Sequence, residues 1–275
     1  MRRVFLCGFL VLGLGFAVAR APVVYAQVNP DAKEPLEITA DESLEWHRND
    51  LYFVARKNVK AVQGTTTLRS ALLTAKYREG AGGGIKIYTI IAEGAVEIIS
   101  AQSKAYGDKA TYDVDKGYAV LTGKNLRLVS PDQTVTARDK MEYWAQQGKL
   151  QATGRAKAVR EGDEIVADVL IADFTQDQNG KRVLKRLRAN GNVVITTPDE
   201  VLVGDKGVYE AGTNLADLTG HVKITRGPNV LEGERAQIDL NTNISKMFGA
   251  SSEGGGGRVR GVFYPGSEEK PAVGQ

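Results

Sequence analysis

The sequence predicts an all-β protein built from repeats of long, bent antiparallel strands. Three observations indicate this fold class. Apolar and polar residues alternate with a period of two, as over residues 110–115, where Ala110, Tyr112 and Val114 share one face. A glycine-led motif recurs along the chain, and turn residues fall at repeating positions. Windows of comparable length do not keep a helical period.

Each repeat begins with a small residue, followed by a run in which Val, Leu or Ile alternates with polar residues. Clear copies start at Gly94, Gly123, Gly191 and Gly220, and weaker copies start at Lys57 and Gly154. The successive separations are 37, 29, 31, 37 and 29 residues, close enough to one unit length for a repeat architecture. Because a glycine inside a strand commonly marks a bulge or a corner, we expect each strand to bend there.

A second element, with an acidic residue near its start and in most copies an aromatic residue at its end, accompanies the first. It occupies residues 107–112, 138–143 and 204–209, and residues 41–46 and 233–238 fit the same frame. Pro131, Pro198 and Pro228 lie between the two elements, each followed by Asp or Asn, which is turn chemistry. The inferred unit is two long, bent antiparallel strands joined by tight turns, repeated about seven times.

Such a stack does not close on itself, so its first and last strands should present unpaired edges. We expect one extended β domain over residues 27–250. Residues 251–275 are interpreted as a glycine-rich linker, a short strand over 258–264 and a disordered tail after Pro265.

Residues 1–26 have the features of a cleavable secretory signal peptide. A positive start is followed by an apolar run from Val4 to Val18 and by Val24-Tyr25-Ala26 at cleavage spacing, so we expect cleavage after Ala26. An uncleaved membrane anchor is the alternative, but Arg20 and Pro22 interrupt the run before it reaches the roughly 20 residues that a bilayer requires. The single cysteine, Cys7, lies inside this segment, so we expect no disulfide and no thiol chemistry in the exported protein.

The charge balance argues against a nucleic-acid partner. The full chain carries 36 Lys and Arg against 33 Asp and Glu. Removal of residues 1–26 takes Arg2, Arg3 and Arg20 and no acid, leaving 33 of each sign. Nucleic-acid binders normally show a basic excess that displaces phosphate counterions.

The residues that could carry chemistry have simpler structural interpretations. His47 and His221 are far apart in the chain and lack a third nitrogen or sulfur ligand, so we predict no metal site and no cofactor. Asp108, Asp205 and Glu234, with Asp41 and Asp139 nearby in register, could suggest the paired carboxylates of a sugar-cleaving enzyme. A carboxylate that recurs at one position of every unit is better explained as a corner residue, so we predict no catalytic residues.

Two further groups remain open between binding and structure. Tyr112, Tyr143 and Tyr209 could line a ligand groove or fill the core, and both can hold together. The cluster from Lys181 to Arg188 could neutralise an anionic head group or form a solvated hairpin flank.

At this point the sequence resembles the periplasmic lipopolysaccharide-transport A family, also called the organic-solvent-tolerance A family. The similarity lies in the opening segment 35–41, in residues 107–112 followed by Ala119-Val120-Leu121-Thr122-Gly123, and in the closing segment 259–263. It covers residues 34 to 264 and lies in the repeat pattern more than in one unique motif.

The resemblance implies a single elongated, twisted open β-jellyroll whose interior holds the acyl chains of lipopolysaccharide. The family's inward positions correspond here to Leu36, Ile38, Ile98, Tyr112 and Val114, each of which the alternation places on an apolar face. Extending this pattern to the other repeats adds Val59, Val96, Leu126, Tyr143, Val193, Ile195, Tyr209, Val222 and Ile224.

The resemblance also implies a location in the periplasm and a set of partners. The N-terminal edge would pair with an inner-membrane export component, and the C-terminal edge with the outer-membrane translocon or with a second copy, head to tail. The rival functions are a structural or adhesive β-solenoid with a filled core and a carbohydrate-active β-helix enzyme.

Overall fold

The computed structural model describes residues 35–80, 84–101, 103–178, 182–242, 244–250 and 257–265, and within these ranges it is built from 18 β-strands and turns. The predicted signal peptide, most of the glycine-rich linker and the tail after residue 265 lie outside the described residues. In chain order the strands are β1 Glu37–Thr39, β2 Ser43–His47, β3 Tyr52–Gln63, β4 Thr66–Glu79, β5 Ile85–Ile99, β6 Lys104–Asp113, β7 Tyr118–Thr122, β8 Leu126–Val129, β9 Gln133–Ala137, β10 Lys140–Trp144, β11 Lys149–Arg160, β12 Asp163–Gln176, β13 Arg182–Thr196, β14 Val201–Glu210, β15 Leu215–Arg226, β16 Asn229–Asp239, β17 Ile244–Phe248 and β18 Arg260–Val262.

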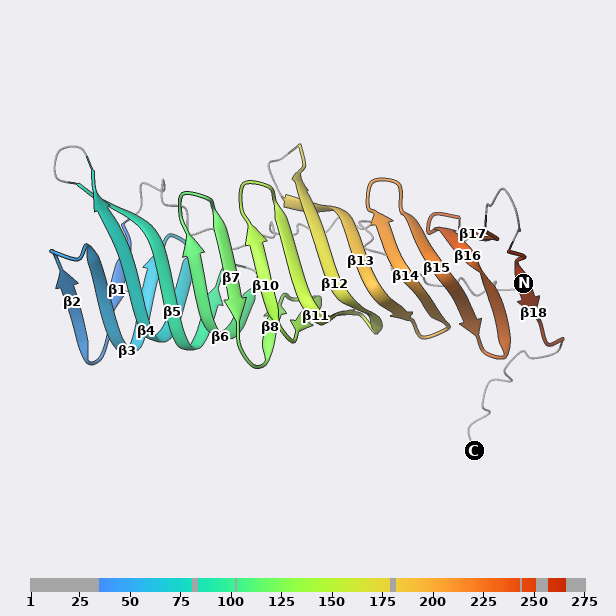
Figure 1. The fold of residues 1–275 in the computed structure, drawn as a ribbon, viewed down its shortest axis with the longest axis horizontal. Coiled ribbons are helices and arrows are strands. Elements are labelled where there is room, and N and C mark those ends of the chain that lie inside the picture. The colour runs from blue at the N-terminus through green and yellow to red at the C-terminus, as the bar shows by residue number, and fades with distance from the viewer. Residues whose placement is uncertain are drawn as a thin grey trace, which may run out of the picture.

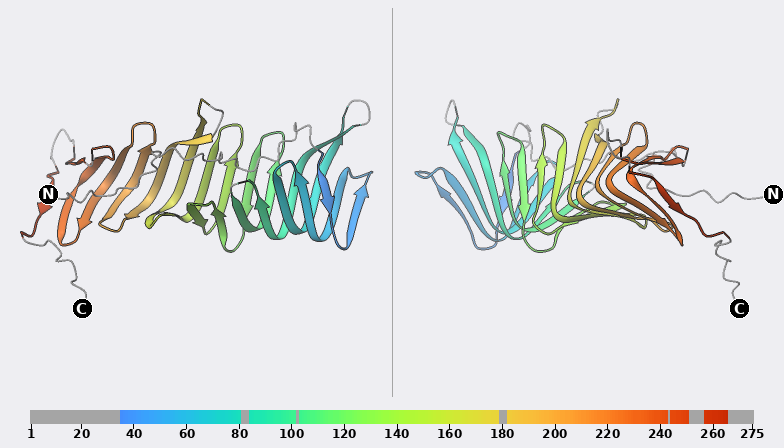
Figure 2. Two further views of the ribbon diagram at one scale, coloured as in Figure 1. Left: turned by 180° about the vertical axis from the view of Figure 1, so that it is seen from behind. Right: turned by 45° about the vertical axis from the view of Figure 1, so that its right-hand side comes forward.

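All 18 strands belong to one antiparallel sheet in which neighbours in sequence are neighbours in space, so the molecule is long and narrow (Figure 1). The predicted all-β, open, repeat-built fold is confirmed. Each long strand bends near its middle, and the two halves face one another across a trough (Figure 2). We call the half that contains β2, β7, β10 and β17 arm 1, and the half that contains β1, β8, β9 and β18 arm 2.

The bends coincide with the predicted glycine positions. The strand register shifts between Glu93 and Val96, Thr153 and Ala156, Asn190 and Val193, and Thr219 and Val222. At these shifts the glycine and the residue after it both have positive φ, for example 80° at Gly94 and 47° at Ala95. The weaker copy at Lys57 and Asn58 behaves in the same way, with φ of 67° and 48°. Each corner is therefore a β-bulge that turns the strand.

The recurring carboxylates lie at these corners, as the sequence predicted. Asp41 accepts a hydrogen bond from Asn58 Nδ2 (2.7 Å), and Asp108 accepts one from the backbone N–H of Lys124 (2.7 Å). Asp205 contacts His221 Nδ1 (2.9 Å) on the next strand. The structure adds Asp168, which accepts from Asn192 Nδ2 (2.8 Å) and which the sequence analysis missed. Each carboxylate thus fastens one bent strand to the bulge of its neighbour.

Not every predicted long strand is continuous, because four of them are each broken into two shorter strands. β1 and β2 are two halves of one bent strand, since both pair with β3. β7 and β8 both pair with β6, β9 and β10 both pair with β11, and β17 and β18 both pair with β16. Counting each such pair once gives fourteen bent strands, or seven hairpin units. Gly123, with a φ of 129°, interrupts the strand between β7 and β8, because this backbone conformation does not continue a ladder.

The fourteen strands contain a longer repeat of six. Residues with equivalent places lie 97 positions apart, as Gly94 does from Gly191 and Tyr112 does from Tyr209. The longest hairpins, β4–β5 and β12–β13, are related by the same spacing. We call residues 36–132 the first repeat and residues 133–229 the second repeat. The chain is therefore two copies of a six-strand unit followed by the last strands.

Replacing Gly154 by alanine should cost more stability than replacing Gly162. Both have nearly the same φ, 94° and 97°, but a Cβ on Gly154 would lie 2.3 Å from Asp139 Oδ2 and one on Gly162 would meet nothing within 4 Å. We expect about 1–2 kcal/mol from backbone strain alone in Gly162→Ala, and a larger loss in Gly154→Ala. Urea unfolding of the two variants measures the difference, and equal losses would contradict a tightly packed corner.

Candidate apolar binding trough

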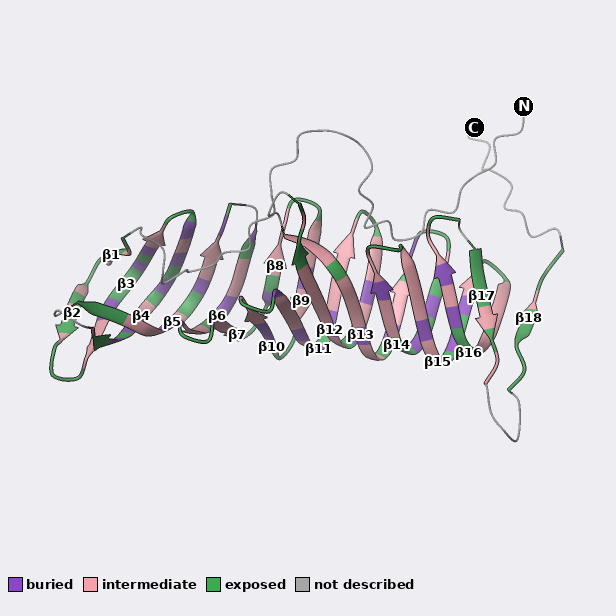
Figure 3. Ribbon diagram, turned by 90° about the horizontal axis from the view of Figure 1, so that it is seen from above, coloured by how far each residue is buried: buried purple, intermediate pink, exposed green. Residues whose placement is uncertain are grey.

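The facing inner surfaces of the two arms are apolar and rich in alanine. Alternate residues of each strand point inward, so buried bands cross the sheet from one end to the other (Figure 3). Ala55, Ala75, Ala152, Ala156 and Ala236 are at most 1% exposed. Small side chains on facing walls leave more space between the arms than leucine or phenylalanine would.

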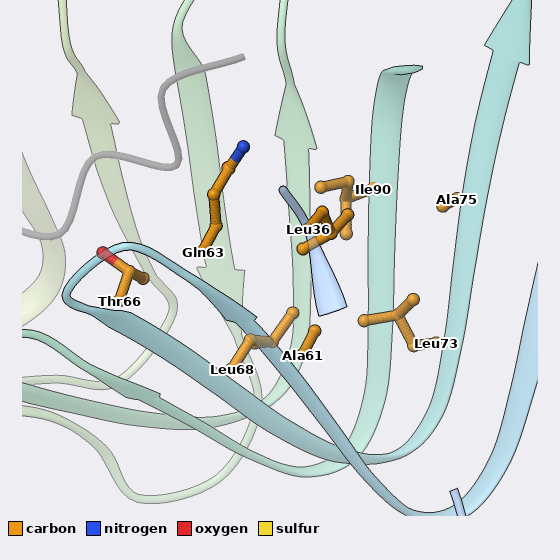
Figure 4. A pocket seen from close by; sticks show the side chains of 8 residues that line it. All are labelled: Leu36, Ala61, Gln63, Thr66, Leu68, Leu73, Ala75 and Ile90. Atoms are coloured by element: carbon orange, nitrogen blue, oxygen red, sulfur yellow. The ribbon is translucent and has the colours of Figure 1, made fainter. Parts of the chain in front are cut away.

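One cavity lies near the N-terminal end, between the two arms. It has an empty volume of about 340 Å³, part of which is open to solvent. Leu36 lies beside Ile90 in this cavity, with Leu73 and Ala75 on β4 (Figure 4). Gln63 and Thr66 lie at its arm 2 end.

A second, larger cavity continues from the first, since Leu68 and Ile90 line both. Its empty volume is about 1070 Å³, again partly open to solvent, and it extends along the sheet from β4 to β11. Ile98, Tyr112, Leu128 and Tyr143 are among the side chains that line it. The two cavities therefore adjoin one another along the apolar inner face, and we call the pair the apolar channel.

Apart from Val114, the predicted interior residues fall into three groups. Leu36, Ile98, Tyr112 and Tyr143 line the two cavities. Val59, Val96, Leu126, Val193 and Val222 are at most 1% exposed and pack next to the corners. The third group lies on the same inner face: Ile224 is part of the buried core, Ile38 and Ile195 pack against that core, and Tyr209 is buried. Val114 is buried but follows the end of β6, and its N–H donates to the carbonyl of Tyr88.

The N-terminal end of the trough carries an uncovered aromatic cluster. The Trp46 ring on β2 packs at a tilt against Phe53, with ring centroids 5.3 Å apart, and the Phe53 ring centroid lies 5.1 Å from that of Tyr77. Trp46 Nε1–H donates a hydrogen bond to Tyr77 Oη (2.7 Å). Pairing with Phe53 places Trp46 on the inner face, yet it is 48% exposed, and Leu44 beside it is 56% exposed. These apolar side chains are open because β2 is an edge strand.

The polar rim on arm 2 differs between the repeats. In the first repeat it consists of uncharged side chains, Gln63, Thr66, Ser100 and Ser103. Their counterparts 97 positions later are Arg160, Asp163, Thr197 and Glu200. Burial raises the pKa of the Glu200 carboxyl, with the charge of Asp199 adding to the rise and the charge of Arg226 opposing it. Burial likewise raises the pKa of Asp163.

On the outer face, Glu142 is nearly buried and serves as a structural carboxylate. It accepts hydrogen bonds from Tyr118 Oη (2.5 Å) and Gln151 Nε2 (3.4 Å), and it pairs with Lys140 Nζ (3.0 Å). Burial, together with the neighbouring Glu142 carboxylate, raises the pKa of Tyr118 to about 12. This network holds β7, β10 and β11 together where the strands are broken.

The remaining candidate residues have structural roles. His47 stacks on Tyr52 at 4.3 Å and bonds to Glu45, while His221 is largely exposed and its bond to Asp205 raises its pKa. Arg186 pairs with Glu210 and Arg188 with Asp173 across neighbouring strands, which favours the hairpin-flank interpretation of that cluster. Lys181 lies outside the described residues.

The described residues contain neither a cluster of metal ligands nor a membrane-spanning helix. No group of three or more His, Cys, Asp or Glu side chains is placed to hold a metal ion in that part of the chain. Within the same ranges there is also no helix that is both long and apolar enough to cross a membrane.

The fold and the channel together define an elongated, open β-jellyroll with an apolar trough along its axis. The model of the family described as LptA/(LptD N-terminal domain) LPS transport protein matches the chain twice, over residues 37–148 and 138–244. The chain therefore belongs to this family. The two matches agree with the tandem repeat seen in the structure.

The comparisons with curated proteins and with solved structures do not add to the family assignment. Curated proteins contain no match to this sequence. Among solved structures, the chain is similar to LptH from Pseudomonas aeruginosa, described as the LptA homologous periplasmic component of the lipopolysaccharide transport device. Identity is 14%, the alignment covers 86% of this chain and 99% of that one, and the TM-score is 0.22. The family assignment rests on the two family-model matches.

Replacing Glu200 by glutamine should flatten the pH dependence of stability. A folded-state pKa above the ordinary value of 4.5 means that the folded protein loses stability as pH rises from that value through the raised one. The Gln variant lacks this titration, so its melting temperature should fall less over that interval and exceed the parent's at pH 7. Glu42→Gln, in an exposed turn, is the control, and identical pH profiles for Glu200→Gln and the parent would contradict a desolvated rim.

Proposed function

We propose that this protein is a periplasmic carrier that holds lipopolysaccharide by its acyl chains and forms part of a bridge from the inner-membrane export complex to the outer-membrane translocon. The observation that carries the proposal is the apolar channel of two adjoining cavities, lined by Leu36, Ile98, Tyr112 and Tyr143, in a chain of this family. Export through cleavage of residues 1–26 is part of the proposal.

The energetics favour such a channel. Each methylene buried from water gains about 0.8 kcal/mol, so a lipid with several chains needs continuous apolar cover to cross an aqueous space. A trough that is open on one side covers the chains and leaves sugars and phosphates in water. Sliding from strand to strand breaks no covalent bond, so the carrier needs no cofactor, and a partner upstream supplies the energy.

The strand count supports assembly through the ends. Since fourteen bent strands alternate in direction, the last strand runs opposite to the first. A following jellyroll can therefore add its first strand antiparallel to β17 and β18 with both arms aligned, by β-strand addition. At the N-terminal end, β1 and β2 offer the corresponding free edge, with Leu44 and Trp46 exposed on the inner face.

A photo-cross-linking residue at Ile98 should capture lipopolysaccharide in cells. Ile98 lines the larger cavity, whereas Glu97 on the same strand points to the other face and pairs with Arg69. We expect cross-linked lipid from position 98 and none from position 97. Equal yields from both positions, or none from position 98, would show that the trough does not carry the lipid.

Aspartate on the inner face of either edge strand should block one end only. Leu44→Asp on β2 places a charge where the trough would continue toward the export component. Ser245→Asp does the same on β17, where Ser245 shares the inner face with its partner Ile238. Both sites are exposed, so folding should survive.

Pull-down of each variant with the inner-membrane component and with the outer-membrane translocon measures the effect. We expect Leu44→Asp to lose the first partner and keep the second, and Ser245→Asp to do the reverse. Retention of both partners by both variants would rule out edge pairing, and the intact middle can be checked by the melting temperature.

A further inference from the structure

We propose that the two repeats hold lipid unequally: the first repeat, with Ala105 in its wall, contains the resting site for acyl chains, and the second repeat is closed at the equivalent place by Leu202. This inference rests on the proposed lipid-carrying function and adds to it the position and the number of resting sites.

The two walls differ at one position in otherwise similar rows. In arm 2 of the first repeat, Ala105 pairs with Ile98 on one side and with Leu128 on the other. The same row in the second repeat is Ile195, Leu202 and Ile224. Ala105 lines the larger cavity, and Leu202 extends three further carbon atoms into the corresponding space.

Burial of equivalent side chains follows this difference. Ala105, Leu128 and Tyr112 are partly exposed to the cavity. Their counterparts Leu202, Ile224 and Tyr209 are 0%, 7% and 5% exposed. Tyr143, on the strand that follows the first repeat, is also partly exposed, whereas Ile238, at the same place on the strand that follows the second repeat, is 2% exposed. The inner face of the second repeat is therefore packed against itself where the first repeat is open.

The polar rims favour lipid binding in the same repeat as the apolar walls do. A lipid chain entering the first repeat passes Thr66 and Ser103, which are uncharged and line the two cavities. One entering the second repeat passes Arg160, only 19% exposed and paired with Asp132 at 3.3 Å, and the desolvated Glu200. Covering such charges further with hydrocarbon is unfavourable. Wall and rim therefore both favour the first repeat as the resting site of the acyl chains. The equivalent place in the second repeat lies six strands, or about 29 Å, farther along the sheet.

The test uses the exchange of the two wall residues, Ala105→Leu and Leu202→Ala, singly and together. Cross-linking residues at Ile98 and at its counterpart Ile195 act as matched reporters, since both are isoleucines, partly buried and adjacent to the exchanged position. Purified full-length mature protein is mixed with less than one equivalent of hexa-acylated lipopolysaccharide. Total bound lipid is measured separately by native mass spectrometry.

In the parent we expect at least fivefold more cross-linking from position 98 than from position 195. Ala105→Leu should reduce the yield at 98 at least fivefold, and Leu202→Ala should raise the yield at 195 severalfold and allow a second lipid to bind. The double variant should reverse the preference. Ala105→Leu fills open space and Leu202→Ala creates a cavity, so only the second variant should lose packing in the folded state. Circular dichroism checks the folding of both variants.

The results separate this inference from the function on which it rests. Equal cross-linking at 98 and 195 in the parent, with lipid bound, overturns the unequal repeats and leaves the carrier function intact. The same holds if lipid binds but neither exchange changes the ratio. Absence of bound lipid by mass spectrometry overturns the carrier function itself.

Discussion

The bend in every strand depends on a backbone conformation that most residues avoid. A positive φ at two successive positions shifts the register and turns the strand, and glycine is the residue that adopts the first of these most readily. If one strand bent at a different level from its neighbours, ladder pairing on one arm would be lost. The carboxylates at Asp41, Asp108, Asp168 and Asp205 join each corner to the next, which keeps the bends aligned. The trough exists because these corners stay in phase.

A sheet that is bent in phase but left open has an inner surface with an unusual requirement. Each arm must be apolar enough to fold against the other, yet the two must not interlock along their whole length. Alanine meets both conditions, because it buries apolar surface at little cost in side-chain entropy and fills little volume. Near the corners, where the arms meet, Val59, Val96 and Leu126 fill the space completely. Farther out, Ala105 and Ala110 leave the larger cavity open.

Much of this organisation could be predicted from the sequence because it is encoded locally. The period-two alternation, the glycine positions and the turn residues Pro131, Pro198 and Pro228 depend on near neighbours in the chain, and the structure has bends and turns there. The broken strands β7–β8 and β9–β10 were not predicted, since whether a strand continues through a corner depends on its partners. Asp168 was missed because the aromatic residue that ends most other copies is absent at its place, and Phe174 comes six residues later instead. Apart from Val114, the predicted interior residues lie on the inner face, but sequence alone did not distinguish those at the filled corners from those beside open space.

The duplication explains why the two halves could diverge. The separations of 37, 29 and 31 residues sum to the 97-residue spacing, so the longer repeat was present in the sequence and would have been visible in an alignment of the chain with itself. Within one covalent chain the junction between the repeats, where β9 and β10 pair with β8, β7 and β11, is permanent. A head-to-tail pair of identical subunits would have two equal troughs, because one sequence would serve both. A tandem chain is free of that constraint, so a substitution such as alanine to leucine can close one trough and leave the other open.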